Sequence, residues 1–169
     1  MTAPSPLPEP TAGRPILYGA PAPDAELLPW SWAQQRLVDG HDYWIASVRE
    51  SGRPHSRPVW GVWLPDGFWF VTASLAQRNI RTNPQVSVHL PDGTSSVIIE
   101  GRCEPATDAE QVRRLAEVYN PKYGWTLRPD GDHGLVADAN EPLGPALRVV
   151  PEVVFGWLEH MGSPTRWRF

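Results

Sequence analysis

The sequence has only one cysteine, Cys103, so no disulfide can form within the chain. It has no apolar run near the roughly 18 residues that a membrane-spanning helix needs, and no basic start followed by an apolar stretch. Its net charge of −4 lacks the basic excess typical of nucleic-acid-binding proteins. These absences predict a cytoplasmic protein with no membrane or nucleic-acid partner, and the 169 residues fit one domain.

Several motifs of catalysis are also missing. No two histidines lie at metal-ligand spacing with a cysteine or carboxylate, so no metal site is expected. There is no Gly-x-Ser-x-Gly elbow and no glycine-rich phosphate loop. Cys103 alternates with polar residues in a strand-like run, which favours a core position.

Proline and tryptophan, by contrast, are abundant, with 20 and 9 residues. Seven of the first 23 residues are proline, so residues 1–26 are predicted to form a disordered or polyproline-like arm. The alternative is an arm that lies across a partner subunit. Residues 27–169 then form the folded domain. Some of the dispersed tryptophans are expected to line an interface or a ligand groove.

The remaining pattern is mainly strand. Alternating or β-rich runs predict strands at 42–49, 55–64, 68–72, 86–90 and 97–103, and two more between 147 and 158, hinged at Pro151. Helices are expected over 29–38, from Ser74 to before Pro84, and from a Thr107–Glu110 capping box onward. Residues 120–144 are predicted to be a long loop that could cover a site. Short hairpin turns make the sheet antiparallel, and closure removes its edges, so we expect an α+β, mainly β fold: a barrel of six to seven strands.

Two segments carry candidate chemistry. In the first, Thr72 and Ser74 end a strand just before a helix that contains Arg78 and Arg81. A helix N-terminus with hydroxyl donors and guanidinium groups suits a phosphate. An ordinary capped helix with solvated arginines is the alternative.

The second segment is residues 53–63, where Pro58 interrupts a predicted strand. Proline cannot donate to a strand ladder, so Pro58 marks an edge or an opening. Unpaired backbone groups at an opening suit a flat heterocycle, whereas an edge strand without a ligand is the alternative.

Together these segments resemble a known family. The run Arg-Pro-His-x-x-Pro-Val-Trp from Arg53, followed by Thr-x-Ser at Thr72 and Arg-Asn-x-x-x-Asn-Pro from Arg78, resembles the pyridoxamine 5'-phosphate oxidase-like split-barrel flavoproteins. It is most similar to the branch with deazaflavin-dependent oxidoreductases, and the resemblance covers residues 27–169.

This resemblance implies a homodimeric oxidoreductase that uses FMN or the deazaflavin coenzyme F-420 for hydride transfer with a small organic substrate. The sequence does not indicate which substrate. The implied cofactor-binding residues are His55, Ser56, Arg57, Pro58, Val59, Thr72, Ser74, Arg78 and Asn79. The last four are expected near the phosphate, and the backbone from Ser56 to Val59 is expected beside the ring. Tyr119, Tyr123 and His55 are the candidate proton donors.

One position departs from the family pattern. Ala76 stands where family members usually carry a lysine that binds the phosphate. Loss of such a contact costs about 1.5–3 kcal/mol of binding, which Arg78 or Arg81 could offset. A basic track for the F-420 tail could combine them with Arg57 and Lys122. The alternative is a non-catalytic split-barrel protein that has lost flavin binding and holds haem, a fatty acid or another apolar ligand.

Overall fold

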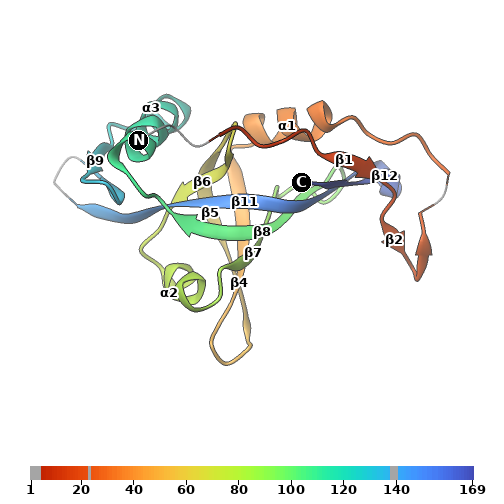
Figure 1. The fold of residues 1–169 in the computed structure, drawn as a ribbon, viewed down its shortest axis with the longest axis horizontal. Coiled ribbons are helices and arrows are strands. Elements are labelled where there is room, and N and C mark those ends of the chain that lie inside the picture. Colours follow the sequence, from red (N-terminus) through yellow and green to blue (C-terminus); the bar gives the residue numbers. More distant parts are fainter. Residues whose placement is uncertain (1–4, 23, 138–140) are drawn as a thin grey trace.

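The structure, a computed structural model, describes residues 5–22, 24–137 and 141–169. Within these ranges, six strands close into an antiparallel barrel in the order β11-β6-β5-β4-β7-β8, and β8 pairs with β11 again (Figure 1). The strands are β4 (Asp42–Val48), β5 (Pro54–Leu64), β6 (Gly67–Val71), β7 (Gln85–His89), β8 (Val97–Pro105) and β11 (Pro142–Leu158). The predicted antiparallel barrel is confirmed.

Every second side chain along the strands points inward, and these side chains fill the barrel. In β4, Tyr43 and Ile45 are buried while their neighbours face outward, and Val86 and Val88 do the same in β7. The two strands predicted within 147–158 are one strand, β11, with a bulge between Pro151 and Val153. Proline has no N–H to donate, so the ladder is interrupted there without ending the strand.

Three helices flank the barrel in the described part of the chain, and none is long and apolar enough to cross a bilayer. Helix α1 (Trp30–Asp39) buries Ala33 and Leu37 in the barrel core. Helix α2 (Leu75–Thr82) begins after Ser74, whose Oγ accepts a hydrogen bond from the Ala76 N–H, as a helix cap does.

Helix α3 (Ala109–Tyr123) forms a second core with the outer face of β5 and β6. Its cap lies one residue later than predicted, because Asp108 accepts from the Gln111 N–H. The Gln111 side chain in turn binds the hydroxyl and N–H of Thr107. The predicted apolar face is confirmed, since Val112, Leu115, Ala116 and Tyr119 are all buried.

The segment predicted as a loop over 120–144 is only partly one. It contains the last turn of α3, then β9 (Arg128–Asp130) and β10 (Gly134–Val136), which pairs with the start of β11. Three-residue strands are too short to show alternation. Residues 138–140 lie outside the described ranges.

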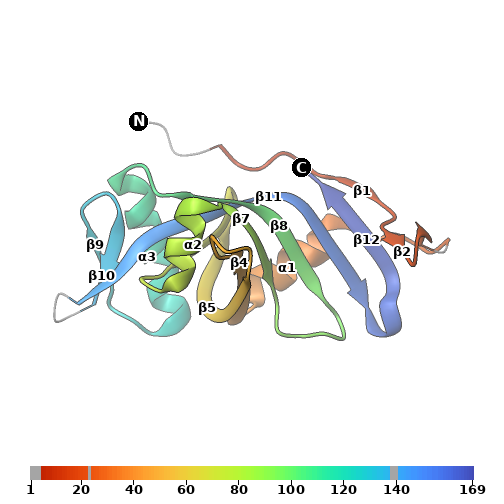
Figure 2. The same cartoon turned by 90° about the horizontal axis from the view of Figure 1, so that it is seen from below.

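The N-terminal segment differs from the disordered arm expected over 1–26. Strand β1 (Thr11–Gly13) pairs with β12 (Gly162–Arg168), while β2 (Ile16–Leu17) and β3 (Ala20–Pro21) form a hairpin (Figure 2). The Leu7 N–H also donates to the Pro65 carbonyl at 2.8 Å. Strand β12 was not predicted, and its free edge supplies the backbone partners that order this segment. Residues 1–4 and 23 lie outside the described ranges.

Candidate functional site

The barrel opens between β5 and β6. Residues Pro54–Trp60 of β5 pair with β4, but only Gly61–Leu64 pair with β6. In β5, alternate residues direct their backbone groups to one edge. On the edge facing β6, the Pro58 carbonyl accepts from Arg57 Nε at 3.3 Å and the Trp60 carbonyl from the Tyr119 hydroxyl at 2.7 Å. Pro58 therefore lies at an opening, as the sequence indicated, where its missing N–H breaks no ladder bond.

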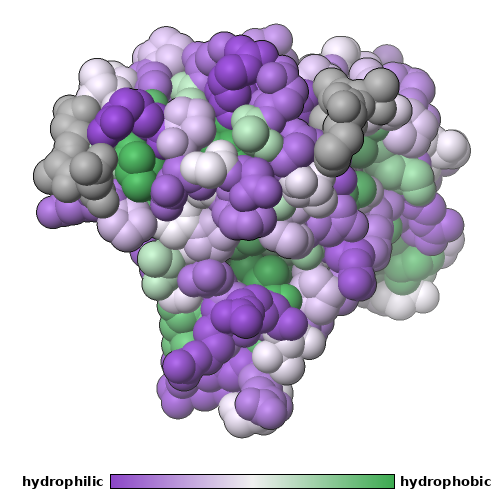
Figure 3. All heavy atoms as spheres, turned by 60° about the vertical axis from the view of Figure 1, so that its left-hand side comes forward, coloured by the Kyte–Doolittle hydropathy of each residue, from purple (hydrophilic) through white to green (hydrophobic). Residues whose placement is uncertain are grey.

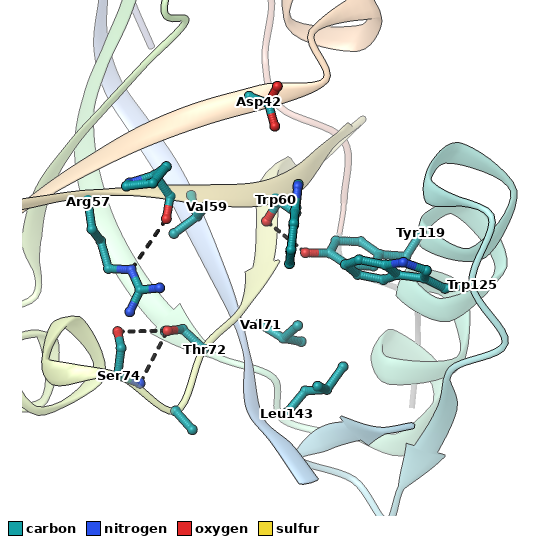
Figure 4. Close-up of a pocket in the computed structure, with 12 residues that line it drawn as sticks. Asp42, Arg57, Val59, Trp60, Val71, Thr72, Ser74, Tyr119, Trp125 and Leu143 are labelled. Carbon is teal, nitrogen blue, oxygen red and sulfur yellow. Dashed lines mark hydrogen bonds between the residues drawn. The ribbon is translucent and has the colours of Figure 1, made fainter. Parts of the chain in front are cut away.

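A cavity of about 550 Å³ occupies this opening (Figure 4). That volume lies within the range of small-molecule sites. In the space-filling view, apolar atoms are visible in a recess above the hydrophilic tip of the β4–β5 hairpin (Figure 3). The residues lining the cavity come from β4, β5, β6, the β6–α2 turn, α3, the turn after α3, and β11: Asp42, Arg57, Pro58, Val59, Trp60, Val71, Thr72, Ala73, Ser74, Tyr119, Trp125 and Leu143.

One end of the cavity is cationic and rich in donors. The Arg57 guanidinium points toward the Thr72 and Ser74 hydroxyls (Figure 4). Ser74 Oγ accepts from Thr72 Oγ1 at 2.8 Å and from the Ala76 N–H at 3.2 Å, which leaves its own hydrogen to donate. The partial positive charge at the start of α2 adds to this. This end suits a phosphate or another anion.

The other end is apolar and aromatic. The rings of Trp60 and Trp125 meet edge to face at 4.9 Å, and Tyr119 lies 5.6 Å from Trp125. Burial raises the pKa of Tyr119 far above its ordinary value, so its hydroxyl stays protonated and donates to the Trp60 carbonyl. Planar uncharged surfaces of this kind suit a heteroaromatic ring.

The structure brings five of the predicted residues to the cavity: Arg57, Pro58, Val59, Thr72 and Ser74. The others lie elsewhere. Arg78 lines an adjoining hollow of about 340 Å³, which shares Ala73 and Ser74 with the cavity and also contains Arg81. Ser56 and His55 do not line the cavity, and Asn79 is buried, where it donates to Ser47 Oγ at 3.0 Å. The Asn79 side chain therefore ties α2 to β4.

Two further positions, Ala76 and Lys122, bear on the cationic track that was expected to bind the F-420 tail. Ala76 is fully buried in the barrel core, so its side chain faces away from solvent. Lys122 Nζ donates to the Tyr43 hydroxyl at 2.9 Å and to the Gly61 carbonyl at 3.0 Å, and it does not line the cavity. Of the four cations expected to converge, only Arg57 lies in the cavity itself.

Sequence reasoning missed the wall formed by Trp125 and Leu143, and it considered Tyr119 as a proton donor or a core residue but not as part of a ligand cavity. A tryptophan in a segment rich in glycine and proline was a usable signal, because large aromatic residues are costly to expose without a partner or ligand. Leu143 carried no such signal, since its position depends on the pairing of β10 with β11.

The closed barrel that opens between two strands over a ligand-sized cavity defines a split-barrel protein. The family model described as pyridoxamine 5'-phosphate oxidase matches residues 35–157. The chain therefore belongs to this family. No curated protein sequence matches it.

Solved structures share the fold at low sequence identity. General Stress Protein 26 from Bacillus anthracis is 18% identical with a TM-score of 0.60, over 83% of this chain and 98% of that one. An FAD-binding protein from Mesorhizobium loti is 18% identical with a TM-score of 0.57, over 84% and 96%. An F-420 reductase is 20% identical with a TM-score of 0.52, over 72% and 94%.

Proposed function

We propose that the protein is an oxidoreductase that binds FMN or the deazaflavin F-420 in the cavity between β5 and β6. The observation that carries this proposal is the polarity of the cavity, with Arg57, Thr72 and Ser74 at one end and an aromatic wall at the other. The family, and the FAD-binding protein and F-420 reductase among the structural neighbours, support a flavin-type cofactor.

The residues present fit such a group. Arg57 and the Ser74 hydroxyl would bind the phosphate, and Trp60, Tyr119 and Trp125 would enclose the ring and exclude water. Backbone groups on the open edge of β5 remain for polar ring atoms. When bound, the cofactor supplies the hydride chemistry, and the protein supplies orientation and electrostatics.

The candidate proton donors have other roles in this structure. The Tyr123 hydroxyl lies 2.7 Å from the carbonyls of both His41 and Gly61, and burial raises its pKa to about 12. Tyr119 is held in the same way by the Trp60 carbonyl. We therefore propose that both hydroxyls replace missing strand neighbours of β5 and keep the opening in shape.

Parallel titration of the purified protein with FMN and F-420, followed by fluorescence, tests the proposal. We expect saturable binding of one cofactor at micromolar or tighter affinity. Arg57→Ala should weaken it about ten- to hundredfold, the cost of a lost charge-assisted contact. The matched control is Arg53→Ala, which changes an exposed arginine that lies outside the cavity lining.

Arg78→Ala tests whether the adjoining hollow takes part. An unchanged affinity in this variant would remove Arg78 from the phosphate site. No binding of either cofactor to the wild type would contradict the proposed function.

The alternative is a non-catalytic split-barrel protein that binds haem, a fatty acid or another apolar ligand. Ala76 favours it, because this position lacks the usual lysine and is closed within the core. Titration with haem and with a fatty acid should be run beside the flavins. Binding of either, with no flavin binding, would establish the alternative.

We also propose that the protein is a homodimer, associated through the outer face of β4 and β5. Trp44 and Trp60 are 38% and 51% exposed on this face, and Pro58 lies opposite Trp44 in the strand register. Exposed apolar clusters of this kind mark interaction sites. Light scattering at micromolar concentration should return twice the chain mass of 18.8 kDa, and the monomer mass would contradict the dimer.

A further inference from the structure

The Asp42 carboxylate lies at the mouth of the cavity, beside its aromatic end. Asp42 is the first residue of β4 and lies opposite Trp60 in the strand register, so the two side chains are neighbours on one face of the sheet. Both residues line the cavity. In Figure 4, Asp42 lies above Trp60 and on the other side of the cavity from Leu143. A negative charge is therefore held next to an indole ring.

Aromatic rings from α3 and from the turn after it lie around the Trp60 side chain. Trp125 meets Trp60 edge to face, with ring centroids 4.9 Å apart, and Tyr123 lies 6.4 Å from Trp60 and 5.2 Å from Trp125. The Tyr123 hydroxyl lies 2.7 Å from the His41 carbonyl, which ties this cluster to the residue before Asp42. The faces of aromatic rings attract cations, and tryptophan does so most strongly. The rings and the carboxylate therefore favour the same kind of ligand.

No lysine or arginine in the described part of the chain forms an ion pair with Asp42. His41 Nδ1 lies 3.3 Å from Asp42 Oδ1, but these two side chains are 62% and 59% exposed, so the contact leaves much of the carboxylate accessible. Lys122 Nζ is directed instead to the Tyr43 hydroxyl and the Gly61 carbonyl. The Asp42 carboxylate can therefore accept hydrogen bonds from a cationic ligand, and such charge-assisted bonds are stronger than neutral ones.

We infer that Asp42 and Trp60 bind the organic reactant of the proposed oxidoreductase, and that this reactant carries a cationic ammonium group. The inference rests on the proposed function and adds a substrate class to it. Asp42 lines the same cavity as Arg57 and Trp125, so a reactant bound there shares one space with the cofactor ring, as direct hydride transfer requires. Arg57 serves the anionic cofactor, and Asp42 serves its cationic reaction partner at the mouth.

Calorimetric titration at pH 7 with 2-naphthylmethylamine and 2-naphthylmethanol tests the inference, because the two probes match in shape and only the amine is charged. The protein is first saturated with FMN or F-420, whichever it binds. We expect the amine to bind about fivefold more tightly than the alcohol, as an exposed ion pair with a cation–π contact gives, and added salt to reduce the difference. Equal binding of the two probes would overturn the inference. Displacement of the cofactor by the amine would do the same, because the probe would then occupy the place of the ring.

Variants locate the charge that the amine recognises. Asp42→Asn removes the negative charge at nearly constant shape, so the preference for the amine should disappear while the affinity for the cofactor stays within about twofold. Asp39→Asn is the matched control, because Asp39 is an exposed aspartate at the end of α1 that does not line the cavity, and it should keep the preference. If Asp42→Asn lowers the unfolding midpoint, Asp42→Ser takes its place. A preference for the amine that persists in the folded variant would overturn the inference.

The mass of the variant separates a ligand site from a subunit contact, because the proposed dimer uses the same two strands. Asp42→Asn should return the same mass as the wild type in light scattering. A lower mass would make Asp42 an interface residue and overturn the inference.

The outcomes also separate this inference from the proposed function. Cofactor binding with equal affinity for the two probes would overturn the inference and leave the oxidoreductase standing. A preference for the amine that depends on Asp42, with neither FMN nor F-420 bound, would support the cation site and overturn the oxidoreductase.

Discussion

Gly144 connects the stability of the barrel to the polar end of the cavity. It lies near the start of β11 with φ +100°, in the region that side chains rarely adopt. A Cβ at this position would lie 2.5 Å from the Thr72 carbonyl oxygen and 2.7 Å from the Ala73 nitrogen. Both neighbours are backbone atoms, so no side chain can move aside. Gly144→Ala must therefore displace the turn that carries Thr72 and Ser74.

The cost has two parts. A left-handed backbone conformation costs an L-residue about 1–2 kcal/mol, and overpacking costs about 1–3 kcal/mol more. The free energy of unfolding should therefore fall by about 2–5 kcal/mol, which in a chain of this size lowers Tm by about 4–20 °C. Displacement of the Ser74 hydroxyl should also weaken FMN or F-420 binding about tenfold.

Urea unfolding and cofactor titration of the same preparation measure both effects. Gly93→Ala is the matched control, because Gly93 is exposed and a Cβ there meets no atom within 4 Å. Its free energy of unfolding should stay within about 0.5 kcal/mol of wild type. If Gly144→Ala keeps the wild-type stability and affinity, then the close approach of β11 to the β6–α2 turn is not as described.

Three further predictions follow from other residues. Asp66 is buried and forms ion pairs with Arg114 at 2.7 Å and Arg148 at 3.3 Å. Asp66→Ala leaves both arginines without this partner, so it should lower the free energy of unfolding in urea by about 3 kcal/mol. A loss under about 1 kcal/mol would refute this prediction. Arg81→Ala should weaken F-420 more than FMN in fluorescence titrations if the hollow of about 340 Å³ beside α2 holds the acidic tail, and equal effects would exclude that role. Burial lowers the pKa of Lys122 from 10.5 to about 8, so the unfolded chain binds more protons between these values and stability should rise with pH across this window. The free energy of unfolding in urea should therefore rise in the wild type relative to Lys122→Met as the pH rises from 8. A difference that stays constant with pH would show that the Lys122 pKa is not lowered.

The elements with a strong local pattern were predictable from the sequence. Alternation at Tyr43 and Ile45 sets which face of β4 is buried, and helical spacing sets the buried face of α3. Ser74 was identifiable as a cap because its hydroxyl bonds to the first turn of its own helix. Pro58 marked the opening because a missing N–H is tolerated only where no strand pairs. In each case the structural feature is set by residues that lie within a few positions of it in the sequence.

The site needed the tertiary structure. Arg57, Ser74 and Trp125 are far apart in the chain. They line one cavity because β5 pairs with β6 only from Gly61 onward and α3 packs across the gap. Asn79 and Lys122 carry the right chemistry for a phosphate site, yet packing directs them to Ser47 and Tyr43. The sequence by itself determined the fold class, the antiparallel barrel and the segments that could bind an anion. Only long-range strand pairing and burial decided which of those side chains face the cavity, because both depend on partners that no local pattern specifies.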